Sequence, residues 1–174
     1  VAVDQVGDLD ANNHDDVYLV NRTGTDDHSI IRVVQDEDGG VAGVIAPVTI
    51  HVSGVDIQNI NAAVYESNSN RVVVIGTREG GAGNLELFFV NPATGAVDTV
   101  GPTVPQALTV AGQPVNIDDS SVEAMTIFGT SALIVLRSGA VDQLGAIDVL
   151  DTPGVVSLVG PSNNNGVISV NALS

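Results

Sequence analysis

The chain alternates between short apolar runs, rich in Val and Ile, and clusters of Gly, Asn, Asp and Pro. Runs of about four to seven apolar residues between turn formers are typical of strands, because branched side chains fit a pleated surface. No window keeps apolar residues at the spacing of an amphipathic helix. The clearest strands are Asp16–Asn21, Ile30–Val34, Arg71–Ile75, Leu85–Val90, Ala132–Leu136 and Ala146–Leu150. The pattern therefore predicts an all-β fold.

The predicted elements recur in one order (strand, strand, strand, turn, strand) at a spacing of about 60 residues. The middle copy reads Asn61–Tyr65, Arg71–Gly76, Leu85–Val90, a turn at Asn91–Gly95, and Val97–Pro102. The third copy reads Glu123–Ile127, Ala132–Leu136, Ala146–Leu150, a turn at Asp151–Gly154, and Val156–Pro161. A fainter first copy reads Val1–Val6, Val17–Val20, Ile30–Val34, a turn at Asp36–Gly40, and Val44–Pro47. We therefore expect a single all-β domain, residues 1–174, with repeats at about 1–55, 56–115 and 116–174.

Four antiparallel strands make up one blade of a β-propeller, so the repeats predict a β-propeller-like array of about three four-stranded antiparallel repeats. The turn at Asn91–Gly95 suits such a meander, because Pro92 presets φ and Gly95 takes a positive φ. Closed propellers have about four to eight blades. Three copies leave several alternatives open: the chain is part of a larger ring, or it self-associates, or the repeats form a β-sandwich or a compact barrel.

Oxygen-bearing groups recur at alternate positions between the first two predicted strands. With Asp8 as position one, Asp10 and Asn12 stand at three and five, His14 offers its main-chain carbonyl at seven, and Asp16 stands at nine. Alternate residues of a tight loop direct their oxygens inward, and Ca²⁺ collects about six or seven oxygens at about 2.3–2.6 Å. Crowded carboxylates also repel one another unless a cation lies between them. The spacing therefore favours a loop that holds a divalent cation.

This loop is not an EF-hand, because position twelve is Leu19 rather than a bidentate Glu and a strand follows it. Over residues 1–21 the chain resembles the FG-GAP/VCBS repeat, the calcium-binding hairpin loop of integrin-α-type propellers. In that family a hydrophobic strand leads into Asp-x-Asp/Asn-x-Asp-Gly-x-x-Asp, and a second hydrophobic strand follows. The resemblance implies Ca²⁺ as the bound ion, held by Asp8, Asp10, Asn12, His14 (through its main chain) and Asp16.

Two positions depart from the family pattern, since Asn12 replaces the usual Asp and Asn13 replaces Gly. Asn tolerates a positive φ better than most residues with a side chain. The corresponding loops of the later repeats, Ser67–Asn70 and Gly129–Ser131, carry no carboxylates. We therefore expect at most one strong calcium site in the chain.

The chain carries 21 Asp and Glu against five Arg and no Lys, for a formal net charge of −16. So acidic a surface cannot release the counterions of a nucleic acid, which excludes nucleic acid as a partner. No stretch approaches the ~18 consecutive apolar residues of a membrane-spanning helix, so no membrane insertion is expected. The absence of Cys excludes disulfides and thiolate metal sites. Because an acidic surface stays hydrated in calcium-containing surroundings, we expect a secreted or cell-surface protein.

Other candidate signals are weaker. His14, His28 and His51 lack the spacing of paired zinc ligands and are predicted to be solvated loop histidines. Asp118–Ser121 is predicted to be a solvated turn, and Gly80–Gly83 a hairpin loop, since no Lys or helix follows it as in a phosphate-binding loop. The Gly-x-Ser-x-Gly motif of serine hydrolases is absent from the sequence.

Two functions follow from these patterns. The first is a secreted or cell-surface calcium-stabilised β-repeat module with a structural, adhesive or assembly role. The alternative is a fragment of a propeller-type hydrolase or lyase that acts on glycans through acidic residues, although glycan-cleaving propellers usually stack sugars on aromatics and this chain has only five. Predicted strands at Val1–Val6 and Gly166–Leu173 could pair at their edges with a second copy or with repeats of a parent protein.

Overall fold

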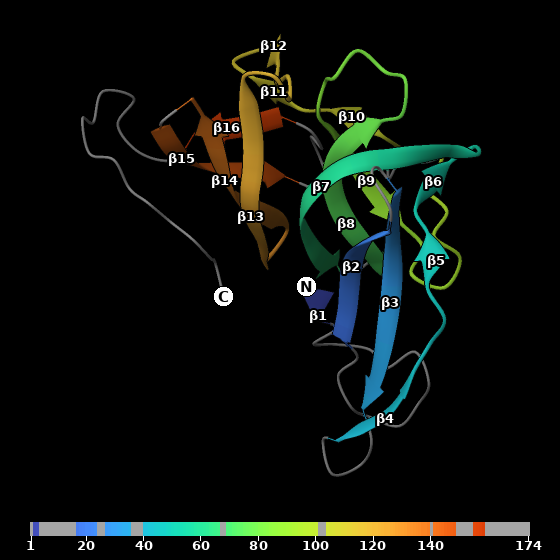
Figure 1. The fold of residues 1–174 in the computed structure, drawn as a ribbon. Coiled ribbons are helices and arrows are strands. Elements are labelled where there is room, and N and C mark those ends of the chain that lie inside the picture. The colour runs from blue at the N-terminus through green and yellow to red at the C-terminus, as the bar shows by residue number, and fades with distance from the viewer. Residues whose placement is uncertain are drawn as a thin grey trace.

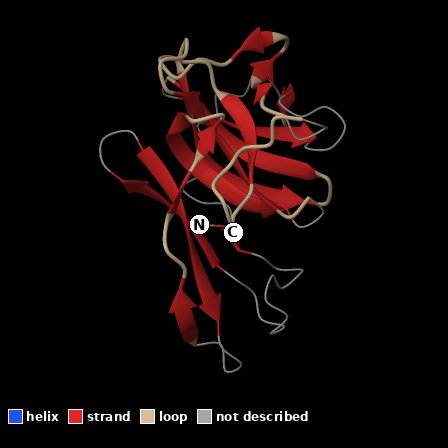
Figure 2. Cartoon of the chain, turned by 90° about the vertical axis from the view of Figure 1, so that its right-hand side faces the viewer, coloured by secondary structure: helices blue, strands red, loops and turns tan. Residues whose placement is uncertain are grey.

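The computed structural model describes residues 2–3, 17–23, 27–35, 40–66, 69–100, 104–139, 141–148 and 155–158. All regular secondary structure in this part of the chain is β-strand, so the all-β prediction is confirmed. The strands form curled sheets that follow one another along the chain (Figures 1 and 2). All of the clearest predicted strands overlap observed ones, namely β2, β3, β8, β9, β14 and β15.

The first sheet is an antiparallel meander. Its order is β1 (Ala2–Val3), β2 (Val17–Thr23), β3 (Asp27–Gln35) and β4 (Val41–Val44), and β5 (Val48–Thr49) pairs with the other half of β3. The outer side of β3 is therefore shared between two short strands. We call β1 to β4 the first to fourth strands of this sheet.

The second sheet repeats this arrangement. Its order is β10 (Gln106–Ala107), β9 (Glu86–Val90), β8 (Arg71–Arg78), β7 (Val55–Glu66) and β6 (His51–Val52). Beside β9, a bridge between Val97 and Val90 adds a very short fourth strand, Ala96–Val97. The predicted turn before it is confirmed, because Gly95 has a φ of 72° and its N–H donates to the carbonyl of Asn91 at 2.8 Å.

The third sheet is again a meander, followed by a short hairpin on its edge. Its order is β13 (Ser120–Phe128), β14 (Ser131–Ser138), β15 (Val141–Asp148), β16 (Val155–Leu158), β11 (Thr109–Val110) and β12 (Gln113–Pro114). All neighbours are antiparallel except β11 and β16, which are parallel. Here β16 is the fourth strand, and β11 pairs with its outer edge.

The second sheet lies between the other two and is apolar on both faces. One face contributes Val73, Ile75, Leu87 and Phe89 to a core shared with Ala132, Ile134, Leu136 and Ile147 of the third sheet. The opposite face contributes Val72, Val74, Phe88 and Val90 to a core shared with Tyr18 and Ile30 of the first sheet. Side chains alternate between faces along a strand, so an uninterrupted apolar run serves both cores at once.

Two short hairpins join the sheets, the first linking hairpin at Ile50–Ile57 and the second at Leu108–Val115. In each, the N–H of the last residue donates to the carbonyl of the first, at 3.2 Å and 2.9 Å respectively. Their turn residues all have positive φ: Ser53 (51°), Gly54 (82°), Ala111 (50°) and Gly112 (79°). Two consecutive positive φ values define the type I′ turn, whose twist matches that of paired strands.

Each linking hairpin is bonded to the sheets on both sides of it. The N–H of Ile50 donates to the carbonyl of His28 in β3 at 2.9 Å, and the N–H of Leu108 donates to the carbonyl of Leu85 before β9 at 2.8 Å. Beyond this point the first hairpin pairs in parallel with the fourth strand of the second sheet, and the second hairpin with that of the third sheet. Each linking hairpin therefore connects the third strand of one sheet to the fourth strand of the next: the first connects β3 to Ala96–Val97, and the second connects the start of β9 to β16.

The second linking hairpin offers a stabilising substitution. Ala111 adopts a φ of 50° at an exposed turn position, where Asn is favoured over Ala. We expect Ala111→Asn to raise the free energy of unfolding by about 0.5–1 kcal/mol, measured by urea denaturation. The same change at exposed Ala107, in strand β10, should give no gain, and equal effects at the two positions would contradict the turn assignment.

Candidate functional site: the connection between the first two strands

The predicted calcium ligands lie in one connection of the first sheet. Asp8, Asp10, Asn12, His14 and Asp16 all fall outside the residues that the structure describes. Both ends of their segment are described, and β1 and β2 pair antiparallel there, Ala2 with Tyr18 and Val3 with Val17. Residues 4–16 therefore connect two neighbouring antiparallel strands, as a hairpin-loop site requires.

The carboxyl end of this connection is anchored in the core. Tyr18, two residues after Asp16, is completely buried and stacks on Tyr65 of β7, with ring centroids 5.3 Å apart and an interplanar angle of 11°. The Tyr65 hydroxyl in turn donates to the side-chain oxygen of Asn70 at 2.5 Å. Strand β2 therefore begins at a fixed position against the second sheet. At the other end of residues 4–16, β1 contacts β7 (Figure 1).

The corresponding connections of the other sheets are built differently. In the second sheet the buried carboxylate of Glu66 accepts the N–H of Ser69 at 2.7 Å. Arg71 donates to the carbonyls of Ser69 and Asn70 at 3.2 Å and 3.0 Å. The third sheet turns between β13 and β14 through Gly129, with a φ of 63°. Within the described residues, these turns close by their own hydrogen bonds or by a glycine, whereas the first sheet has the long acidic segment.

Four carboxylates elsewhere in the described chain, Glu86, Asp98, Glu123 and Asp142, lie beside arginines. Arg71 bonds Asp98 at 3.0 Å, and Arg78 bonds Glu86 at 2.8 Å. Arg137 bonds Asp142 at 2.7 Å and lies 3.9 Å from Glu123. The hydrogen bond and charge of Asp142, and then the charge of Glu123, raise the pKa of the Arg137 guanidinium above its ordinary value. These contacts hold neighbouring strands together and neutralise the carboxylates that take part in them.

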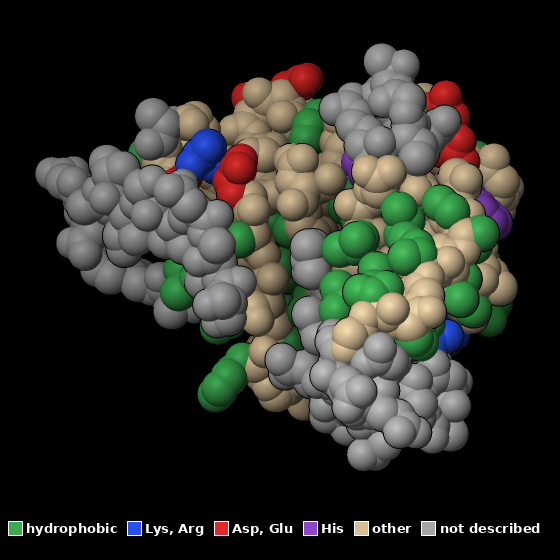
Figure 3. Space-filling model, turned by 60° about the horizontal axis from the view of Figure 1, so that its bottom comes forward, with side chains coloured by type: hydrophobic (Ala, Val, Ile, Leu, Met, Phe, Trp, Pro, Cys, Tyr) green, Lys and Arg blue, Asp and Glu red, His purple; other side chains and the backbone are tan. Residues whose placement is uncertain are grey.

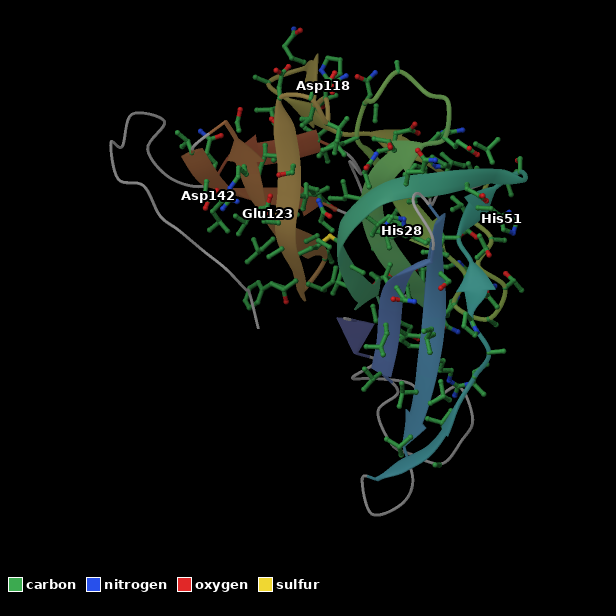
Figure 4. All side chains as sticks on the ribbon, in the orientation of Figure 1. His28, His51, Asp118, Glu123 and Asp142 are labelled. Carbon is green, nitrogen blue, oxygen red and sulfur yellow. The ribbon has the colours of Figure 1, made fainter. Side chains whose placement is uncertain are left out.

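The titratable side chains labelled in Figure 4 lie in separate parts of the described chain. Figure 4 shows Glu123 and Asp142 on the third sheet, Asp118 at its tip, and His28 and His51 on the opposite part of the molecule. In the part of the chain that is described, no group of three or more His, Cys, Asp or Glu is placed to hold a metal ion. The acidic connection of the first sheet therefore remains the candidate site.

The histidine prediction is wrong for His28. It lies in strand β3 and is only 5% exposed, and His51 is half-buried in β6, while His14 lies outside the described residues. The residues around His28 are polar, which suggested a loop. At this end of β3 the first linking hairpin bonds to the main-chain carbonyl of His28, so the segment is a strand held on both sides and not a solvated loop.

The predicted hairpin loop at Gly80–Gly83 is confirmed, and the predicted solvated turn at Asp118–Ser121 is confirmed only for its first half, because Ser120 and Ser121 are half-buried in β13. Asp118 and Asp119 are exposed in a turn, where Asn116 accepts the N–H of Asp118 at 2.9 Å through its side chain. Residues Gly80–Gly83 form the connection between β8 and β9, with Gly80 and Gly83 at φ values of 68° and 74°. Neither segment brings together groups with binding chemistry.

Comparison of the chain with protein-family models, curated proteins and solved structures found no match. Among the described residues, no helix has the length and apolar character needed to cross a membrane.

Proposed function

We propose that this chain is a calcium-stabilised β-repeat module with a structural, adhesive or assembly role, outside the cell or at its surface. The observation that carries the proposal is the acidic connection, residues 4–16, between the paired strands β1 and β2. A cation held there would join the oxygens of Asp8, Asp10, Asn12, His14 and Asp16. Its role would be structural, since β2 begins next to the connection and is packed into the core through Tyr18.

A propeller-like array is the arrangement that best accounts for the three sheets. Each sheet is a meander, each packs face to face on the next, and each junction uses the same kind of linking hairpin. The first strand of the second sheet, β7, also contacts the first strands of the other two, β1 and β13. Neighbouring first strands are expected where blades are arranged around a common axis.

The physical case for calcium is electrostatic. Asp8, Asp10, Asp15 and Asp16 place four carboxylates within nine residues of a chain whose net charge is −16. Their mutual repulsion opposes folding of the connection unless a cation neutralises it. Oxygen ligands suit Ca²⁺, and sites of extracellular modules bind it with dissociation constants on the order of 10⁻⁴–10⁻³ M. Such affinity suits surroundings in which calcium is abundant.

Thermal unfolding with and without calcium tests the proposal. For a dissociation constant of about 10⁻⁴ M, calcium at a hundredfold excess should stabilise the fold by about 2.7 kcal/mol. For a chain of this length that corresponds to a rise in Tm of about 5–10 °C over the sample with chelator. The double substitution Asp8→Asn with Asp10→Asn should abolish the calcium-dependent rise.

The matched control changes the same charge at an exposed turn, through Asp118→Asn with Asp119→Asn. This variant should keep the full calcium-dependent rise in Tm, because these residues take no part in the proposed site. If both double variants respond to calcium equally, or if the unaltered chain does not respond, the calcium proposal is wrong.

A further inference from the structure

The outer edge of β4, the fourth strand of the first sheet, lacks a neighbour that the fourth strands of the other two sheets have. In the second sheet Ala96 pairs in parallel with His51 of the first linking hairpin, and in the third sheet Val155 pairs in parallel with Thr109 of the second. Within the described residues, β4 pairs with β3 alone, and it lies at one end of the molecule (Figure 1). Its outer edge therefore offers backbone groups to an incoming strand.

Hydrogen bonds fix which backbone groups of β4 face outward. The N–H of Ile45 donates to a carbonyl of β3 at 2.8 Å, just as the N–H of Asp98 donates to a carbonyl of β9 at 3.1 Å. Backbone groups alternate in direction along an antiparallel strand, so the N–H and C=O of Val44 point away from β3. In the second sheet the corresponding N–H, that of Val97, donates to the carbonyl of His51 at 2.9 Å. The first sheet presents the same donor at its open edge.

The side chain at this position is covered in the other two sheets and exposed in the first. Val97 and Val156 directly follow the residues that pair with the linking hairpins, and they are 6% and 4% exposed. Val44 is 62% exposed. The open edge of β4 therefore lacks side-chain contacts as well as backbone partners that its counterparts have.

The surface around Val44 is apolar and carries no charge. Val41 and Ile45 are 67% and 50% exposed, and residues 39–55 contain no Asp, Glu, Lys or Arg. On the end of the molecule where β4 lies, hydrophobic side chains gather in one area, and the acidic side chains of the described residues lie apart from them (Figure 3). Exposed edge strands are usually protected by charged side chains. An edge without this protection is suited to pairing with another strand.

The strands that cover the other two edges define the chemistry of the missing one. In each, the residue that pairs with the fourth strand is flanked by two apolar residues that enter a core. In the first linking hairpin these are Ile50 and Val52, which are 0% and 4% exposed. In the second they are Leu108, which is fully buried, and Val110, which is half-buried against the core. The common pattern is a large apolar residue, a variable residue and Val.

A second copy of the chain has no free strand of this kind among its described residues. Strand β6 pairs with β7 on one side and with Ala96 on the other, and β11 lies between β12 and β16. Two copies that each carry a net charge of −16 also repel each other. These observations favour a segment of a different polypeptide that has no acidic residues.

We propose that the outer edge of β4 binds an extended segment of a partner protein by strand addition. The segment runs parallel to β4 and carries the pattern large apolar residue, variable residue, Val. The carbonyl of its variable residue accepts the N–H of Val44, and its two apolar side chains cover the exposed side chain of Val44. The contact repeats one that the molecule makes at both of its linking hairpins. This inference goes beyond the proposed function and does not depend on the ion.

A peptide that copies a linking strand tests the proposal on the 174-residue chain. The probe is Gln-Ala-Leu-Thr-Val-Ala-Gly, residues 106–112, with blocked ends. Added to the isotope-labelled chain, it should shift the amide resonances of β4, that of Val44 most, and leave those of the third sheet unchanged. The matched control peptide carries Leu108→Ser and Val110→Ser and should bind at least tenfold more weakly. Shifts confined to other sheets, or equal binding of both peptides, would overturn the proposal.

Substitutions of Val44 separate the backbone contact from the side-chain contact. Val44→Pro removes an N–H that faces away from β3, and Pro is tolerated on such an edge, so the Tm should stay within a few degrees. The affinity for the peptide should fall at least tenfold, whereas Val44→Ala, which keeps the N–H, should lower it only severalfold. Unchanged binding by Val44→Pro would overturn the proposal.

A second pair of variants tests the same edge without altering the backbone. Val44→Asp should also lower the affinity for the peptide at least tenfold, because it places a charge against an apolar strand. Phe128→Asp is the matched control, since Phe128 is 78% exposed at the end of β13, and it should leave the affinity unchanged. Equal effects of the two substitutions would contradict the assignment of the site to β4.

Light scattering distinguishes a partner segment from a second copy. Without peptide, the chain should have the mass of one chain, 17.7 kDa. Twice this mass, reduced to one chain by Val44→Pro, would show that β4 pairs with β4 of a second copy and would overturn the proposal of a separate partner.

Discussion

Replacing Phe88 with Ala is expected to lower the free energy of unfolding by about 3–5 kcal/mol and to release the first sheet before the third. Phe88 is fully buried in β9 and belongs to the core that the second sheet shares with the first. Truncation to Ala would leave a cavity between the two sheets, which a closely packed core fills only in part. Urea denaturation measures the loss, and amide hydrogen exchange shows where protection falls.

The adjacent residue provides a matched control. Phe89 has the same size and burial in the same strand, but its ring belongs to the core shared with the third sheet. Phe89→Ala should cost a similar amount and lower protection in β13, β14 and β15, whereas Phe88→Ala should lower it in β2 and β3. If both substitutions lower protection in the same sheet, the assignment of the second sheet to the position between the other two is wrong.

Replacing Gly95 with Ala is expected to lower the free energy of unfolding by about 3–5 kcal/mol, measured by urea denaturation. Gly95 has a φ of 72°, and a Cβ there would lie 2.0 Å from the carbonyl oxygen of Thr49. The first linking hairpin would have to move away. It would then lose the bond from the N–H of His51 to the Gly95 carbonyl, now 3.0 Å, and the bond from Val97 back to His51, now 2.9 Å.

Substitution of Gly80 distinguishes the two causes of this loss, which are the positive φ and the close approach of the Thr49 carbonyl. Gly80 has a similar φ of 68°, but a Cβ there would meet nothing within 4 Å. Gly80→Ala should therefore cost only the conformational term of a left-handed residue, about 1–2 kcal/mol. Equal losses at the two positions would show that the close approach between Gly95 and the linking hairpin contributes nothing.

Local features of the fold could be predicted from the residues that form them. Pro92 and Gly95 specify a turn through their own dihedral angles, and the turn is found where they stand. The runs around Val72–Ile75 and Leu87–Val90 form strands of the central sheet, where both faces are buried. For the candidate site, the sequence predicts a hairpin connection, and the pairing of β1 with β2 places one there. Its ligands remain a prediction.

The positions of the linking hairpins, and the strands with which they pair, could not be predicted from the residues that form them. Their first strands, β6 and β11, are only two residues long, and the partners of these strands lie far along the chain, as His51 and Ala96 do. The Ser53–Gly54 and Ala111–Gly112 pairs are the one local signal, because both favour a tight turn. His28 shows the same limit, since its polar neighbours in the chain indicate a loop, whereas the sheet places it in β3 at 5% exposure.

The sequence by itself determined which segments become strands, where several turns fall, and where acidic oxygens crowd into one connection. These features depend on backbone dihedral preferences and on the alternation of side chains over a few neighbouring residues. Only the tertiary structure decided that the second sheet lies between the other two, that paired hairpins join them, and that Val44 is left open while Val97 and Val156 are covered. Those outcomes depend on which apolar faces meet, and that is a property of segments distant in the chain.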